Sequence, residues 1–364
     1  MEIMSAISLY NVITGKKFLR HAIQEVLNIS KTVQKDAINF RLDPKIERCL
    51  RSVDVLGTFT DNPMNASQLS PVAIHTHVSK SRASTPSSQT SPGNRDPLPE
   101  YNTNLYGKFD VKEKSDSEVC SIYDICQLPD ETILITDFSN TKLKRLNQSY
   151  KLLHSLKLPM KAYSICNAGS DEVAVSLFAA KKVQYISVKK EMRLTRSFST
   201  SSHCRGMVCV DDKLYVCCGN DNGSPPYCID VYDNTGQLHH SISGLSSVPL
   251  YITVTDDGQH LLVNRRKSDN ITMMDLTGNV VTLFSIRDLK QPSGICTNGT
   301  GQMFVCGRDS NTVVQLEAKQ QKEDVILEEK DGVRKPFAIC FDRKFSRLFI
   351  GSISSNSLLV FNLK

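Results

Sequence analysis

The chain has 364 residues, of which 40% are hydrophobic, and its formal net charge is +6. This length and composition allow one large buried core, and the modest charge permits an acidic partner without requiring one. The first twenty residues lack the pattern of a secretion signal, and no stretch of about 18 apolar residues predicts a membrane span. The sequence therefore favours a cytoplasmic protein.

Residues 1–60 carry a helical pattern. Apolar residues at steps of three and four form one seam: Leu19, Ala22, Val26, Ile29 and Val33. Charged and amide side chains occupy the other faces of this helix. The seam predicts a coiled-coil-like segment that could form a homodimer or a heterodimer. Two heptads also suit a single amphipathic helix that packs on its own chain, so both alternatives stay open.

Residues 61–103 are dense in Ser, Thr and Pro and poor in large apolar side chains. This composition predicts a disordered linker. Three dipeptides in it, Ser70-Pro71, Thr85-Pro86 and Ser91-Pro92, fit proline-directed phosphorylation, although such pairs are also common in linkers by composition alone.

Residues 104–364 contain an internal repeat. The stretches YDICQLPDETILITD (123–137) and SGICTNGTGQMFVCG (293–307) share an apolar anchor, a polar turn and a short hydrophobic alternation, and four more stretches follow the same pattern. Successive anchors are 40, 42, 45, 43 and 44 residues apart, at Ile125, Ile165, Met207, Ile252, Ile295 and Ile339. This spacing establishes six units of one repeat.

Each unit contains four short runs with the character of β-strands, separated by Asp, Asn, Gly and Ser. Four strands in about 43 residues, repeated six times, predict a mainly β fold, a six-bladed β-propeller. The last unit ends one strand short, at 357–364. We expect the segment 105–112 to supply the missing outer strand, because a three-stranded blade would leave an exposed edge.

The chain has no Trp, which argues against the Trp-Asp type of propeller repeat. The segments QPSGICTNGTGQMFVCGRDSNTVVQL (291–316) and YDICQLPDETILITDFSNTKLKRL (123–146) instead resemble the NHL repeat. The second unit departs from this pattern at FAAKK (178–182), where the loop Asn is missing.

The stretch AINFRLDPKIERCLRSVDVLGTF (37–59) resembles the end of the coiled-coil region in tripartite-motif (TRIM) proteins. A coiled coil, this segment, a linker and an NHL-like propeller follow one another in that family. The resemblance implies a recognition protein, or the substrate-recognition portion of a ubiquitin ligase.

Tripartite-motif proteins usually open with RING and B-box modules, which need clustered Cys and His pairs. The first Cys here is Cys49 and the first His is His21, so these modules cannot be built from the residues before the helical segment. We therefore expect no intrinsic ubiquitin-ligase activity. The chain could instead recruit, dimerise with or antagonise a RING-bearing relative.

The sequence contains no motif of a zinc protease or of a serine hydrolase. No His-Glu-x-x-His or Gly-x-Ser-x-Gly motif occurs, and none of the twelve cysteines forms a Cys-x-x-Cys pair. We expect no cofactor, no metal and mostly buried free thiols. Inward-facing Asp or Asn side chains at the propeller axis leave open a small chance of a metal-dependent hydrolase or lyase.

Basic residues gather in the loops that a propeller presents on one face, which makes this face a candidate binding surface for protein or for single-stranded RNA. An ordinary solvated rim is the plainer alternative. The loop GNDNGSPPYC (219–228) is the insertion best suited to shape a pocket there. The predicted binding residues are Lys161, Lys181, Arg205, Arg265, Arg266, Lys267, Lys290, Arg308, Arg334 and Lys335.

Overall fold

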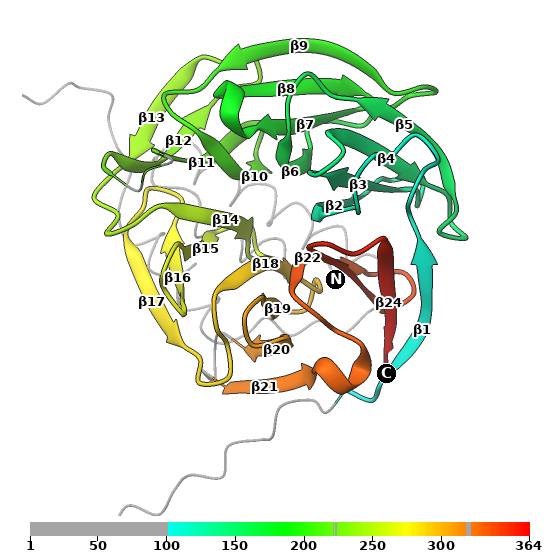
Figure 1. Ribbon diagram of the computed structural model, residues 1–364. Coiled ribbons are helices and arrows are strands. Elements are labelled where there is room, and N and C mark those ends of the chain that lie inside the picture. The colour runs from blue at the N-terminus through cyan, green and yellow to red at the C-terminus, as the bar shows by residue number, and fades with distance from the viewer. Residues whose placement is uncertain (1–100, 221, 223, 318–321) are drawn as a thin grey trace, which may run out of the picture. The chain divides into compact units, whose positions relative to one another are not determined.

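A computed structural model describes residues 101–364 of the protein, except 221, 223 and 318–321. The helical segment predicted for 1–60 and nearly all of the predicted linker lie outside the described residues. The described residues form six four-stranded antiparallel sheets around a central axis, as Figure 1 shows. The predicted six-bladed propeller is thereby confirmed.

The strands are grouped into blades in chain order. Blade 1 contains β2 (Ile122–Gln127), β3 (Ile133–Asp137), β4 (Lys142–Leu146) and β5 (Leu152–Lys157). Blade 2 contains β6 (Ala162–Asn167), β7 (Glu172–Leu177), β8 (Lys182–Ser187) and β9 (Arg193–Ser199). Blade 3 contains β10 (Cys204–Val210), β11 (Lys213–Gly219), β12 (Tyr227–Tyr232) and β13 (Leu238–Ile242).

The second half of the ring repeats this order. Blade 4 contains β14 (Pro249–Val254), β15 (His260–Arg265), β16 (Asn270–Asp275) and β17 (Val280–Ser285). Blade 5 contains β18 (Pro292–Thr297), β19 (Gln302–Gly307), β20 (Thr312–Glu317) and β21 (Lys322–Leu327). Blade 6 contains β22 (Pro336–Asp342), β23 (Arg347–Ser352), β24 (Ser357–Leu363) and β1 (Thr103–Asp110).

Short 3₁₀ helices in the described loops are η2 (Phe178–Ala180) and η3 (Glu329–Asp331). Within the described residues, no helix has the length and apolar character needed to cross a membrane.

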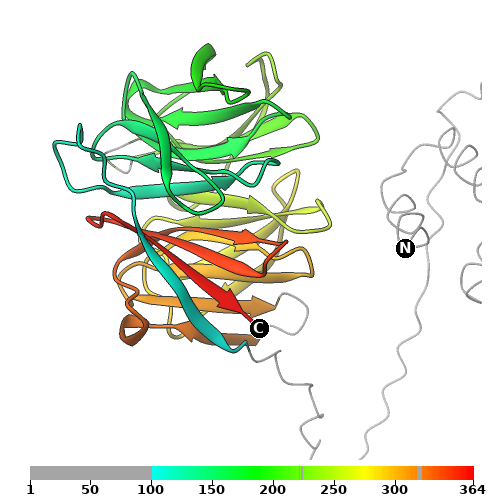
Figure 2. The ribbon, with the colours of Figure 1, turned by 90° about the vertical axis from the view of Figure 1, so that its right-hand side faces the viewer.

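The ring is closed by β1, the predicted outer strand. It pairs antiparallel with β24, from Thr103 opposite Leu363 to Asp110 opposite Ser357. Figure 2 shows this strand, in cyan, beside the red C-terminal strand. Both ends of the propeller chain therefore lie in blade 6, and the strand-edge argument made from the sequence is confirmed.

A separate apolar cluster fills each of the six interfaces between neighbouring blades. In blade 1, Leu134 packs toward blade 2, whereas Ile133 and Ile135 pack toward blade 6. This arrangement follows from the period of two in a strand, which sends alternate side chains to opposite faces of a sheet. Both faces of each blade are covered, so the inner strands are buried almost throughout.

Two glycines let neighbouring inner strands approach closely. A Cβ atom on Gly294 would lie 2.8 Å from the carbonyl oxygen of Phe337, and one on Gly206 would lie 2.7 Å from that of Leu250. These distances are shorter than a carbon–oxygen contact allows. Gly294, in the stretch Pro292-Ser293-Gly294-Ile295, therefore serves the packing of blade 5 against blade 6.

A repeated side-chain clamp fixes the connections between blades. The residue just before the third strand accepts a hydrogen bond from the backbone of the following connection, at 2.8–2.9 Å. The three pairs are Asp269 with Gln291 N–H, Asn311 with Lys335 N–H, and Asn356 with Cys120 N–H. These clamps hold the loops of one face in a defined conformation.

The connection from β1 to β2, residues 111–121, is anchored by a buried cation. The Nζ atom of Lys144 lies 2.5 Å from Asp116 Oδ2 and 2.8 Å from Asp137 Oδ2, and all three side chains are fully buried. It also donates to the carbonyl oxygen of Val111 at 2.9 Å. The ammonium thus ties the connection to β3 and β4 at the point where the ring closes.

We predict that Lys144→Met lowers the free energy of unfolding by about 3–5 kcal/mol, because it leaves two buried carboxylates without their cation. Lys151→Met, at an exposed position of the same blade, should change this free energy by less than about 0.5 kcal/mol. Urea unfolding of both variants measures the difference. Equal changes in the free energy of unfolding for Lys144→Met and Lys151→Met would show that the ion pairs of Lys144 do not stabilise the closed ring.

The same network predicts acid sensitivity. Burial raises the pKa of Asp116, but hydrogen bonds from Lys142 and Lys144 outweigh it and lower this pKa to about 2. The unfolded chain has an ordinary Asp pKa of about 3.9. The contribution of Asp116 to stability is therefore fully present above about pH 4 and is lost as the pH falls toward 2.

We expect the urea midpoint to fall across this range in the unmodified chain and to fall less steeply in Asp116→Asn. Unfolding curves between pH 2 and 5 test this expectation. Parallel pH profiles for the two proteins would contradict it.

Candidate binding face

One face of the propeller carries the loops from the second to the third strand of each blade and the connections between blades, and we call it the upper face. Nine of the ten predicted basic residues lie in these loops or at their edges: Lys161, Lys181, Arg265, Arg266, Lys267, Lys290, Arg308, Arg334 and Lys335. All are exposed or partly exposed. The structure thus brings residues from five blades onto one surface.

Two of these cations have an acidic partner nearby. Arg308 pairs with Asp309 at 2.8 Å, and Arg334 pairs with Glu329 at 3.2 Å. Among the described residues, no ion pair involves Lys161, Lys181, Lys267, Lys290 or Lys335. The upper face therefore keeps an excess of positive charge that can attract an anionic partner.

Arg205 does not belong to the surface. Its exposed fraction is 3%, and its guanidinium donates to the carbonyl oxygen of Gly219 at 2.8 Å. The guanidinium carbon also lies 4.9 Å from the centre of the Phe178 ring. The sequence placed Arg205 on the exposed binding face, but the structure buries this side chain near the start of β10, which begins at Cys204.

An aromatic cluster fills the axis beneath the upper face, and we call it the axial aromatic patch. Tyr163, Tyr251 and Phe337 are its buried part. Tyr123 and Phe178 are partly exposed. The patch therefore brings aromatic side chains from several blades together at the axis.

Phe138 extends the axial aromatic patch to the surface. Its ring stacks on Tyr123, with ring centres 4.0 Å apart and an interplanar angle of 8°. The Nζ atom of Lys161 lies 5.1 Å from the centre of the Phe138 ring. An apolar surface with an adjacent cation is therefore available at the centre of the upper face.

A cavity of about 490 Å³ lies between blades 3 and 4, and we call it the blade 3–4 cavity. The loop after β11 supplies Asn222 and Tyr227 to its lining, and the loop after β15 supplies Arg266 and Lys267. Within the first loop, Asn220 donates from Nδ2 to the carbonyl oxygen of Pro225 at 3.0 Å. The predicted insertion at 219–228 thus does line a cavity with the predicted basic residues.

Asp124 carries a carboxyl group on β2, the inner strand of blade 1. It accepts hydrogen bonds from Ser164 Oγ at 2.6 Å and from the Ile165 N–H at 2.9 Å, and Ser164 Oγ in turn accepts from the Met207 N–H at 3.2 Å. Burial raises the pKa of Asp124 to about 6. Asp124 and Ser164 thereby join the inner strands of blades 1, 2 and 3, which is a structural role.

The cluster Asp116, Cys120 and Asp137 has the residue types of a metal site. The Lys144 ammonium already occupies its centre, 3.3 Å from Cys120 Sγ and in contact with both carboxylates. A metal ion could enter only by displacing Lys144. The cysteines among the described residues are free and are buried or partly buried, as the sequence predicted for most of them.

Sequence reasoning missed the axial aromatic patch, although a signal was present. Tyr123, Tyr163 and Phe337 all stand two residues before the apolar anchor of their unit. Alignment of the units therefore could have placed three aromatic rings at the same level of the axis. Phe138 lies in a loop, and its position also recurs, because Phe138 and Phe178 each stand 13 residues after the anchor of their unit.

Comparison with curated proteins gives relatives of one kind. The chain is 23% identical over 294 residues to the human (Homo sapiens) E3 ubiquitin-protein ligase TRIM56 and 24% identical over 294 residues to that of Mus musculus. Each match covers 74% of this chain but only 37% and 38% of the relatives. The chain thus spans little more than a third of the length of these proteins.

Solved structures show the same fold at low identity. Virginiamycin B lyase from Staphylococcus aureus superposes with a TM-score of 0.54 and 14% identity, over 73% of this chain and all of the lyase chain. A Bacteroides thetaiotaomicron protein of unknown function gives a TM-score of 0.58 and 9% identity, over 73% and 76% of the two chains. No family model matches the sequence. These likenesses concern the fold alone.

We predict that Arg205→Gln lowers the free energy of unfolding by about 1–3 kcal/mol, because the buried carbonyl oxygen of Gly219 loses its charged donor. Lys267→Gln, on the exposed upper face, should leave stability within about 0.5 kcal/mol of the unmodified chain. Thermal and urea unfolding measure both. A stable Arg205→Gln protein would argue that Arg205 has no structural role.

Proposed function

We propose that this chain is a recognition protein without catalytic activity of its own, and that the upper face of its propeller binds an acidic segment of a protein partner. The observation that carries the proposal is the stacked pair Tyr123 and Phe138 at the centre of this face, with Lys161 beside it. Aromatic anchors surrounded by polar and charged groups are typical of the residues that dominate the energy of protein interfaces.

The charge of the upper face supports an acidic partner. Lys161 lies beside the stacked rings, and further lysines without an ion pair among the described residues, Lys181, Lys267, Lys290 and Lys335, lie in other loops of the same face. Such a rim steers an anionic partner during encounter, while the central rings provide contact area that desolvates on binding. The rigid ring keeps both parts in place before the partner arrives.

The similarity to TRIM56 suggests a purpose for binding a partner protein. Because TRIM56 is an E3 ubiquitin-protein ligase and the match lies in the propeller part of this chain, we propose that the propeller presents a substrate protein to a RING-bearing relative. The helical segment predicted for 1–60 would provide the contact with that relative. In this arrangement the ligase activity resides in the partner.

Single-stranded RNA is the second candidate for the upper face. The blade 3–4 cavity combines the aromatic ring of Tyr227 with Arg266 and Lys267. Aromatic rings that stack on bases and cations that contact phosphates are the usual elements of such sites. The upper face thus offers RNA a second location, separate from the stacked pair at the axis.

The test measures binding of the full chain to two fluorescent probes, a pool of acidic peptides that each carry one aromatic residue and a pool of random single-stranded RNA. We expect the peptide pool to bind, and the variant Phe138→Ala/Lys161→Gln to weaken this binding by about tenfold or more, as the loss of an interface anchor does. The matched control is Leu153→Ala/Lys189→Gln, which alters an exposed apolar residue and an exposed lysine away from the upper face.

Each outcome decides between the candidates. RNA binding with a steep salt dependence, lost when Arg266 and Lys267 become Gln, would replace the protein proposal with the RNA one. Equal losses in the anchor variant and the control would overturn the assignment of the site. Ubiquitin transfer by the purified chain with only the activating and conjugating enzymes would contradict the absence of intrinsic activity.

A further inference from the structure

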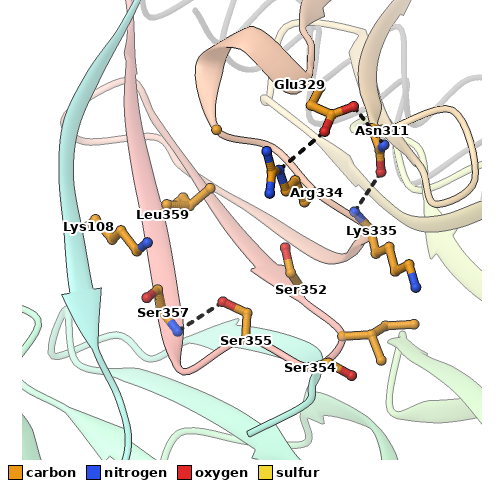
Figure 3. Close-up of a pocket in the computed structure, with 12 residues that line it drawn as sticks. Lys108, Asn311, Glu329, Arg334, Lys335, Ser352, Ser354, Ser355, Ser357 and Leu359 are labelled. Carbon is orange, nitrogen blue, oxygen red and sulfur yellow. Dashed lines mark hydrogen bonds and ion pairs between the residues drawn. The ribbon is translucent and has the colours of Figure 1, made fainter. Parts of the chain in front are cut away.

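A second cavity, of about 460 Å³, lies between blades 5 and 6, and we call it the blade 5–6 cavity. Figure 3 shows its walls: the connection that follows η3 on one side, the loop 353–356 at the base, and β1 with β24 on the other side. It opens on the upper face beside Lys335. Segments that lie about 230 residues apart in the sequence, at Lys108 and Arg334, share this cavity.

The cavity is rich in positive charge. Lys108, Arg334 and Lys335 line it, and Glu329 is the acidic residue among its lining residues. Glu329 is already engaged, because its Oε1 lies 3.2 Å from Arg334 Nε and its Oε2 accepts from Asn311 Nδ2 at 3.3 Å. Lys108 has no ion pair among the described residues.

The ion pair with Glu329 uses only the Nε edge of the Arg334 guanidinium. The two terminal nitrogens make no hydrogen bond within the part of the chain that the structure describes. Glu329 thus orients the guanidinium and leaves its other edge available. A planar fork of N–H donors held in this way is suited to bind an oxyanion through two parallel hydrogen bonds.

The base of the cavity presents hydroxyl groups. Ser352, Ser354, Ser355 and Ser357 all line it, as Figure 3 shows. The Ser355 oxygen accepts a hydrogen bond from the Ser357 N–H at 3.2 Å, so its hydroxyl hydrogen remains a donor. Among the hydrogen bonds of the described residues, none uses the hydroxyl of Ser352 or Ser354.

The walls are fixed without a ligand. The Ile353 N–H donates to the carbonyl oxygen of Lys335 at 3.2 Å, and the Ser355 N–H donates to that of Cys120 at 2.9 Å. Asn311 accepts from the Lys335 N–H at 2.8 Å. Backbone hydrogen bonds therefore hold the loop 353–356 against the connection that contains Arg334 and Lys335. A ligand meets a site that is already formed.

We propose that the blade 5–6 cavity binds the phosphoryl group of a phosphorylated serine or threonine in a protein ligand. This proposal rests on the recognition function proposed above and names the modification that the ligand carries. Lys108 and the free edge of Arg334 contact the phosphoryl oxygens, and the serine hydroxyls donate to the remaining ones.

A phosphoryl group fits this donor set better than a carboxylate does. It carries about −1.5 to −2 charges at neutral pH and three terminal oxygens, each able to accept several hydrogen bonds. The cavity offers two kinds of cation and a row of hydroxyl donors on different walls, which a planar carboxylate with two oxygens would leave partly unused. The cavity volume also leaves room for the peptide that bears the group.

The test uses the full chain and two fluorescent peptide pools with identical random flanks, one with a fixed central phosphoserine and one with serine. We expect the phosphoserine pool to bind about tenfold more tightly, since charge-assisted bonds exceed neutral ones by this order. The variant Lys108→Gln/Arg334→Gln should lose that preference, and inorganic phosphate should compete for the phosphoserine pool. The matched control Lys189→Gln/Arg193→Gln removes two exposed cations from blade 2 and should keep the preference.

Equal binding of the two pools would overturn the proposal. Loss of the preference in the control variant would also overturn it, because the effect would then reflect net charge and not this cavity. If both pools bind equally and Phe138→Ala/Lys161→Gln weakens them, the phosphoryl site fails while the recognition function stands. If neither pool binds and the acidic peptides also fail to bind, both proposals fail.

Discussion

Closure of the ring is the constraint on which the rest of this structure depends. Blade 6 is completed by β1, whose backbone pairs with β24, so the two ends of the propeller are joined by a strand ladder. The connection that follows β1 is held by the buried ammonium of Lys144 between Asp116 and Asp137. Each apolar cluster lies between two blades. Loss of the β1–β24 pairing would therefore open the ring and expose the apolar interface between blades 6 and 1.

A closed ring also explains how the upper face can serve recognition. Side-chain clamps such as that of Asn311 on the Lys335 N–H tie loops of this face to the neighbouring connection. The exposed rings and cations therefore project from a frame that does not need to reorganise. Binding energy that would otherwise order flexible loops remains available for contact with the partner.

The sequence predicted the framework well and the site in part. The anchors spaced by 40 to 45 residues gave the six blades, and the incomplete last unit gave the closing strand. Nine of the ten predicted basic residues lie in the loops of the upper face or at their edges, and their role in binding stays a prediction. Arg205 was misplaced because a basic residue at the end of a loop and one at the start of an inner strand look alike in sequence. Only the folded structure shows that this side chain is buried.

The sequence by itself determined the local elements, because strand alternation, turn residues and repeat period are properties of near neighbours along the chain. The tertiary structure alone decided which side chains meet. The burial of Lys144 between Asp116 and Asp137, and the cavity that Lys108, Arg334 and Ser355 line together, arise between segments that no periodic pattern relates. Their proximity depends on the twist and closure of all six blades, so the recognition sites became visible only in the assembled ring.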